Sequence, residues 1–133
     1  MFHFNYKQAL LTAKLASKED GNYLGVYRNY APMQMFLALA ETDSPEAYIH
    51  PVLDQIRQYD HLHKTEYYKT LRLFCLTMQN KDSTSIQLAI HRNTLLYRLN
   101  RMRDLFNVTY EDEQTALHLL VSFLLIDIME RFS

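Results

Sequence analysis

Residues 90–106 read IHRNTLLYRLNRMRDLF, and this stretch decides the fold of the chain. Apolar residues recur in it at steps of four, three and four, namely Leu95, Leu99, Met102 and Phe106. That spacing puts them on one stripe of an α-helix, the stripe that packs against a core. The other positions carry four arginines and, from His91 to Arg103, no acid: Arg92, Arg98, Arg101 and Arg103. We therefore predict an amphipathic helix with an apolar side and a basic side.

A second, shorter helix is predicted just upstream, over residues 83–89, with a turn at residues 89–91. Its inward-facing residues are expected to be Ile86, Leu88 and Ala89. In the basic helix, Asn93 or Thr94 is expected to cap the first turn by accepting a backbone N–H bond. Asn107 is expected to end that helix in the left-handed conformation. Two helices joined by a very short turn, the second of them basic and capped, are typical of a helix-turn-helix.

The composition favours an all-α protein, which we predict to be a multi-helix bundle. The 133 residues include only two glycines and three prolines, whereas a β-sandwich or barrel needs a turn signal every eight to twelve residues. With 48% hydrophobic residues, the chain is also long enough to bury a core. Further helices are expected over residues 3–18, 33–40, 45–60, 65–78 and 115–129, and Pro51 is expected to interrupt or kink the third of these.

Two features of these segments are specific enough to be tested. Residues 23–30 are expected to form an extended linker or a single helical turn. The helix over residues 65–78 is expected to be capped by Thr65 and to end at Asn80 and Lys81. Its inward-facing residues are expected to be Tyr68, Leu71, Phe74, Cys75 and Met78.

The residues of catalytic and metal sites are not found at recognisable spacings. The single cysteine, Cys75, stands in an apolar run and excludes an internal disulfide. His61 and His63 lack a third ligand nearby, so we expect no metal. Two glycines cannot form a glycine-rich phosphate loop, and no nucleophile, acid and base converge. We therefore expect neither an enzyme nor a cofactor.

Membrane insertion is also not expected. The longest apolar run, residues 117–128, is interrupted by His118, Ser122 and Asp127, so it is too polar to span a bilayer. The absence of a signal peptide and the single cysteine fit a cytoplasmic protein.

Charge is distributed unevenly along the chain, although the net charge is only −1. From Asp104 to the C-terminus there are six acids and one arginine, so positive charge is concentrated in residues 91–103. One basic face on a nearly neutral domain is what docking to DNA requires, because the position of the charge matters more than its sum.

From about Gln55 to Phe123 the sequence resembles the C-terminal helix-turn-helix of PucR-type transcription regulators, the group that includes the sugar diacid regulator. The resemblance rests mainly on the run His91-Arg92-Asn93-Thr94-Leu95 followed by Tyr97-Arg98-Leu99. Further matches are Tyr59-Asp60, Thr70-Leu71, Leu88, Asp112 and Leu117-His118-Leu119. The second helix also resembles those of Fis-type and nitrogen-regulator DNA-binding domains.

The resemblance implies a sequence-specific DNA-binding domain of a bacterial transcription regulator. Its partner is then double-stranded DNA, and any small-molecule effector binds upstream domains that this chain lacks. The chain departs from the family pattern at Ser85, Asn107 and Leu96. Leu96 replaces a commonly polar or basic residue, so this protein is expected to read a different base there or none.

The candidate DNA-binding residues fall into three groups. His91, Arg92 and Leu96 are expected to face base edges, because residues at the N-terminal end of a recognition helix reach them. Thr94, Tyr97, Arg98 and Arg101 are expected to contact phosphates. Ser83 and Thr84 are expected to offer backbone N–H groups to a phosphate, and Asn93 either contacts DNA or only caps its helix.

Structural alternatives exist for several of these residues. The ring of Tyr97 is alternatively packed, with only its hydroxyl exposed, and Arg98 alternatively pairs with Asp104 or Glu111. Arg92 has the fewest structural alternatives.

We expect residues 1–58 to form a helical linker or dimerisation region and residues 59–133 the helix-turn-helix domain, in a fragment of a longer regulator. A homodimer on symmetric half-sites is expected. The alternative function is a helical protein-interaction or dimerisation module without its own DNA specificity.

Overall fold

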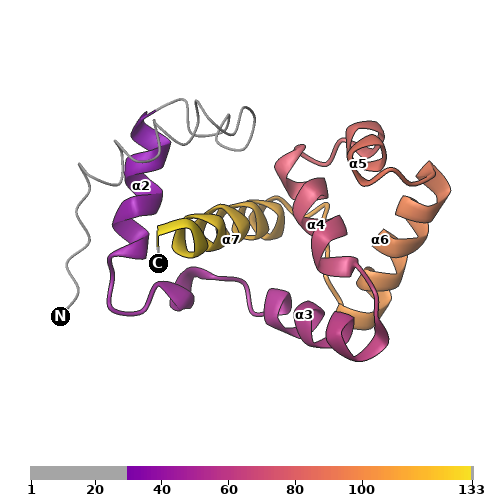
Figure 1. The fold of residues 1–133 in the computed structure, drawn as a ribbon, viewed down its shortest axis with the longest axis horizontal. Coiled ribbons are helices and arrows are strands. Elements are labelled where there is room, and N and C mark those ends of the chain that lie inside the picture. Colours follow the sequence, from indigo (N-terminus) through magenta and orange to yellow (C-terminus); the bar gives the residue numbers. More distant parts are fainter. Residues whose placement is uncertain (1–29, 133) are drawn as a thin grey trace. The chain divides into compact units, whose positions relative to one another are not determined.

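The computed structural model describes residues 30–132, in which every regular element is helical and no strand occurs. The elements are α2 (Tyr30–Ala40), the 3-10 turn η2 (Pro45–Tyr48), α3 (Val52–His63), α4 (Tyr67–Leu76), α5 (Lys81–Leu88), α6 (Arg92–Phe106) and α7 (Glu113–Phe132) (Figure 1). The all-α prediction is confirmed. The helix expected over residues 3–18 and the linker expected over residues 23–30 lie outside the described residues, apart from Tyr30 at the start of α2.

The chain is divided into two compact units. The first contains residues up to Tyr48 together with residues from Leu124 onward, and the second is Ile49–Phe123. In the first unit, Pro32 lies in the first turn of α2, and Phe36 and Leu37 are buried. Pro51 separates η2 from α3, which confirms the predicted interruption.

The second unit is built around α4, which packs against α3, α5 and α6 (Figure 1). α3 also packs against α6. Half of the residues predicted to face inward are buried, namely Leu71, Phe74, Cys75, Leu95, Leu99 and Met102, and Leu119 and Phe123 of α7 are buried as well. The core therefore holds the apolar side of the basic helix.

The N-terminus of α4 is capped from α3, by Asp60. Its carboxylate accepts hydrogen bonds from the backbone N–H of Tyr67 at 2.9 Å and of Tyr68 at 2.8 Å, and from the Thr65 hydroxyl. The prediction that Thr65 caps this helix is wrong, because α4 begins two residues later and Thr65 donates to the same carboxylate.

The C-terminus of α4 also differs from the prediction. The helix ends at Leu76, because Met78 and Gln79 adopt the left-handed conformation, with φ of 57° and 62°. Met78, predicted to face inward, is therefore 75% exposed. Asn80 does not end α4 but caps α5, with its side chain accepting from the Ser83 N–H at 2.8 Å.

The long C-terminal helix α7 begins at Glu113, two residues earlier than predicted, and continues to Phe132. Asp112 precedes it and accepts from both the backbone N–H and the hydroxyl of Thr115. These bonds favour the ionised carboxylate and lower the pKa of Asp112. Among the described helices, none is long and apolar enough to cross a membrane.

Candidate nucleic-acid interface

The connection between α5 and α6 is a tight turn closed by backbone hydrogen bonds. Ala89 lies in the left-handed region, with φ of 55° and ψ of 44°, and ends α5. Its N–H and that of Ile90 donate to the carbonyls of Ile86 and Ser85, each at 3.0 Å. A non-glycine residue in this conformation costs about 1–2 kcal/mol, so the geometry of the turn is imposed by packing of the two helices.

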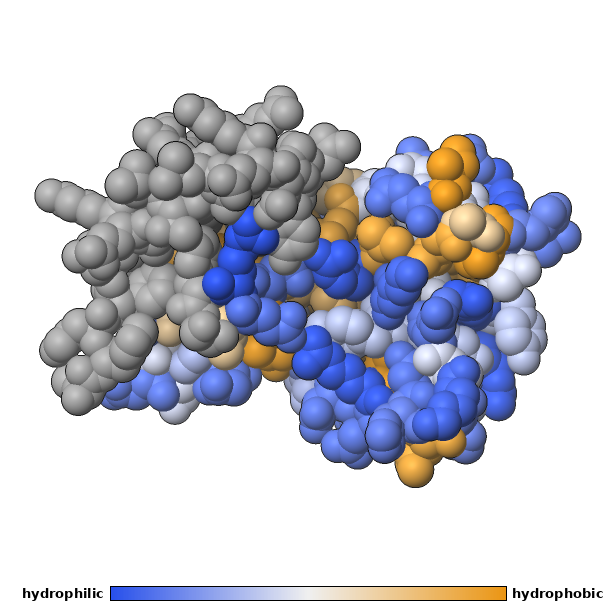
Figure 2. All heavy atoms as spheres, in the orientation of Figure 1, coloured by the Kyte–Doolittle hydropathy of each residue, from blue (hydrophilic) through white to orange (hydrophobic). Residues whose placement is uncertain are grey.

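The first of these helices exposes apolar surface. Ile86, predicted to face inward, is 76% exposed, and Ala89 is exposed as well. Both predictions are wrong, because α5 begins at Lys81 and buries Thr84 and Ser85 instead. Figure 2 shows apolar surface gathered in this part of the molecule.

The inner side of α6 is fixed in the core. Leu95 and Met102 are fully buried and Leu99 is 4% exposed. The hydroxyl of Tyr110 donates to the Leu99 carbonyl at 3.1 Å, and burial raises the pKa of that hydroxyl. These contacts determine which side of α6 faces solvent.

His91 caps α6 by accepting the backbone N–H of Asn93 with its Nδ1 atom at 3.0 Å. The prediction that Asn93 or Thr94 caps the helix is therefore wrong. Both residues lie inside the first turn, where their side chains are exposed and point outward. Nδ1 is an acceptor in this arrangement, so the neutral imidazole carries its proton on Nε2.

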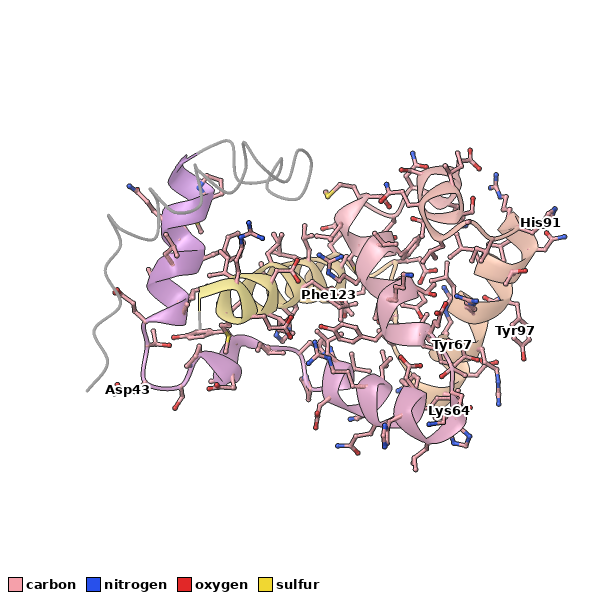
Figure 3. All side chains as sticks on the ribbon, viewed as in Figure 1. Asp43, Lys64, Tyr67, His91, Tyr97 and Phe123 are labelled. Carbon is pink, nitrogen blue, oxygen red and sulfur yellow. The ribbon has the colours of Figure 1, made fainter. Side chains whose placement is uncertain are left out.

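The outward face of α6 is formed by residues three and four positions apart: Asn93, Tyr97, Asn100, Arg101 and Asp104. All five are exposed, and Tyr97 is 63% exposed. The alternative in which its ring is packed is thus contradicted. Figure 3 shows His91 and Tyr97 on the side of α6 that faces away from α4.

Arg101 is the residue of this face with the clearest capacity to bind, whereas the Asn100 side-chain oxygen accepts a hydrogen bond from Arg103 at 3.3 Å. No carboxylate of the described residues pairs with Arg101. Asn100, at the same level of the helix, was not among the predicted site residues, although its spacing of three from Tyr97 marks it in the sequence. Leu96 is only half-buried beside this face, so it retains surface for an apolar contact.

Arg92 has a structural partner, contrary to expectation. Its Nη1 atom lies 2.9 Å from Oδ1 of Asp82 in the first turn of α5. Both side chains are well exposed, at 55% and 74%. Sequence spacing gave no sign of this pair, because the two residues are ten positions apart and meet only through the turn.

Arg98 is attached to α4. Its Nη1 atom donates to the Thr70 hydroxyl at 3.0 Å and lies 3.8 Å from Glu66. The alternative in which Arg98 forms an ion pair was right, but the partner is Glu66 and not Asp104 or Glu111. Glu111 pairs with Arg103. The Arg98 side chain is only 20% exposed, so phosphate contact by Arg98 stays a prediction.

The structure contradicts the role expected for Ser83 and Thr84. The Ser83 N–H donates to Asn80, and the Thr84 N–H donates to the Asn80 carbonyl. Thr84 is fully buried, with its hydroxyl bonded to Asn80 and Thr77. Both residues lie inside α5 rather than at its start, so their N–H groups are already used.

A separate pocket of about 380 Å³ lies between the end of α4 and the first turns of α7. Its lining includes Cys75, Met78, Tyr110, Glu113, Leu117 and Leu120. Burial raises the pKa of the Cys75 thiol to about 12, so the thiol stays protonated and serves as an apolar wall.

Metal-binding geometry is not present in the part of the chain that the structure describes, where no three of His, Cys, Asp and Glu come together. His61 and His63 are exposed at the end of α3. The His63 ring instead lies against Tyr59, with ring centroids 4.1 Å apart.

Comparison with known protein families gives a match of residues 67–125 to the PucR C-terminal helix-turn-helix domain. The matched family is one of transcription regulators, not of enzymes. Among curated relatives, the chain is similar to the proline-responsive transcriptional activator PutR of Bacillus subtilis (strain 168), with 25% identity over 125 residues. The match covers 92% of this chain but only 30% of PutR. No solved structure matches the chain significantly.

Proposed function

We propose, from the match of residues 67–125 to the PucR C-terminal helix-turn-helix domain, that the chain binds double-stranded DNA sequence-specifically with α6 in the major groove. An α-helix fits that groove, and its N-terminal residues reach base edges. The observation that carries the proposal is the outward face of α6. It holds polar, aromatic and basic side chains and no acid before Asp104.

Base reading is proposed for the start of the helix. His91 has a free donor at Nε2, and Leu96 offers an apolar surface suited to a thymine methyl. Arg92 has the donors for a bidentate bond to guanine, which is worth about 1–3 kcal/mol of discrimination. Asn93 adds an amide that suits adenine.

Phosphate contact is proposed for the next turns, by Thr94, Tyr97 and Arg101. Arg101 has the strongest support, because it is exposed and pairs with no carboxylate of the described residues. Arg98 ranks below it, because it must leave Thr70 to reach a phosphate.

We also propose that this domain serves a bacterial transcription regulator that acts in the cytoplasm as a homodimer on two half-sites. Residues 1–58 are the proposed linker or dimerisation region, and residues 59–133 the proposed DNA-binding region. Because the chain spans 30% of PutR, effector sensing is assigned to regions outside it.

A protein-interaction module is the second candidate function, and one observation favours it. Met78 and Leu117 are 75% and 63% exposed at the rim of the pocket beside α7. Exposed apolar groups around a concave site are common at protein interfaces. This function is compatible with DNA binding, because the pocket and the outward face of α6 have no residue in common.

The salt dependence of binding tests the DNA-binding proposal. Arg101→Ala should weaken binding to every duplex alike and reduce the slope of log K against log salt by about one, since one phosphate contact is lost. Arg103→Ala is the control, because it removes the same charge from a side chain held by Glu111 and should leave the slope nearly unchanged. Equal slopes for Arg101→Ala and the parent chain would exclude Arg101 as a phosphate contact.

A further inference from the structure

The ion pair between Asp82 and Arg92 joins the first turns of α5 and α6. An exposed pair of this kind contributes little to stability, about 0–1 kcal/mol. The two helices also pack directly against each other. The Asn80 side chain fixes the start of α5, and backbone bonds from Ala89 and Ile90 close the turn. The pair is therefore not needed to hold the fold.

A carboxylate beside a DNA-binding helix also carries a cost. Phosphates repel it, so an acid at this place lowers affinity for every sequence. A compensating benefit must come from what the carboxylate does to Arg92, the group it contacts.

We propose that Asp82 is a positioning residue that determines base specificity by orienting the guanidinium of Arg92. This inference rests on the proposed function. A guanidinium is planar and carries five N–H donors in a rigid fork. Once Nη1 is held by Oδ1 of Asp82 at 2.9 Å, the directions of the remaining donors are restricted.

A restricted fork favours one base over the others. A bidentate bond to the O6 and N7 atoms of guanine needs two donors aligned in one plane. Restricting Arg92 before binding reduces the conformational entropy lost when that bond forms. Opposite any other base the fork finds no matching pair of acceptors. Orientation of Arg92 by Asp82 therefore widens the difference in affinity between the correct and incorrect sequences.

The experiment compares four variants on three kinds of DNA. The probes are a duplex recovered from a random pool by the parent chain, its single-base-pair substitutions, and duplex DNA of random sequence. The variants are Asp82→Asn, Arg92→Ala, their double mutant, and Asp104→Asn. Asp104 is the matched control, because it is an exposed acid on the outward face of α6 and its replacement removes the same charge.

For Asp82→Asn we expect the preference for guanine at one position to fall about tenfold, a large part of what a bidentate pair provides. Binding to random-sequence DNA should stay equal or tighten, and the melting temperature should not change. Asp104→Asn should tighten binding to all probes equally and leave the preference unchanged. In the Arg92→Ala background, Asp82→Asn should have no further effect on the preference, since the two residues act together.

The inference is overturned if Asp82→Asn behaves like Asp104→Asn, or if its effect on the preference persists in the Arg92→Ala background. That second outcome would mean that Asp82 contacts a base itself. If the proposed DNA-binding function itself is wrong, the result differs: the parent chain recovers no preferred duplex, and no variant changes a preference.

Discussion

The Asp60→Ala substitution tests how α4, the element against which α6 packs, is held in place. The half-buried Asp60 carboxylate accepts two backbone N–H groups of α4 and the Thr65 hydroxyl. Loss of a single capping side chain costs about 0.5–2 kcal/mol. Because three donors lose their acceptor here, we expect a loss of about 2 kcal/mol, near the upper end. For a domain of this size that corresponds to a melting temperature lower by roughly 6–10 °C.

Urea unfolding and thermal melts followed by circular dichroism measure this loss. Asp54→Ala is the matched control, since Asp54 lies on the same helix, is exposed and accepts only from Gln58 at 3.1 Å. The control should change stability by less than about 0.5 kcal/mol. DNA binding at low temperature should be unaffected, because the outward face of α6 is not touched. A loss for Asp60→Ala no greater than that of the control would refute the capping argument.

Two further predictions concern titrating groups. Burial, and secondarily the neighbouring His118, lower the pKa of His50 below 6.5, so the unfolded chain binds a proton more readily than the folded one. The free energy of unfolding should therefore be highest above pH 6.5 and fall below it. In urea titrations at pH 7.5 and 5.5, His50→Asn should lose less unfolding free energy between the two pH values than the parent chain loses. Equal losses would contradict this prediction. For Cys75, whose thiol pKa is about 12, iodoacetamide at pH 8 should label the native chain far more slowly than the urea-unfolded chain, and similar rates would disprove burial of the thiol.

The helices and the buried stripe were predictable from the sequence because each depends on local periodicity. The basic amphipathic helix predicted within residues 90–106 is α6, which spans Arg92–Phe106. Leu95, Leu99 and Met102 are buried as their spacing indicated, and Asn107 ends the helix with φ of 53°. Propensity and pattern agree in this segment, so local information was sufficient.

The caps were mostly mispredicted, because they depend on residues that lie outside the helix they serve. Asp60 reaches α4 from α3, and His91 replaces Asn93 as the cap of α6. An imidazole nitrogen is not among the common capping groups. The paired Met78 and Gln79 in the left-handed region end α4 early, and no glycine marked that position.

The partners of the arginines could not be predicted from the sequence either. Arg98 bonds to Thr70, 28 positions away, and Arg92 bonds to Asp82 across the turn. Such pairs are set by how helices pack, and charge counting along the chain does not reveal them. The basic side of α6 was predicted, but which arginine is available for DNA required the structure.

The central claim, that the outward face of α6 reads DNA, is tested most directly by selecting duplexes from a random pool with the 133-residue chain. The account predicts one enriched motif, with symmetric half-sites if the chain pairs on DNA. It also predicts that Arg92→Ala relaxes the preference at a guanine, whereas Arg103→Ala recovers the parent motif. Recovery of no enriched sequence at low salt, or an unchanged motif with Arg92→Ala and Tyr97→Ala together, would contradict the claim.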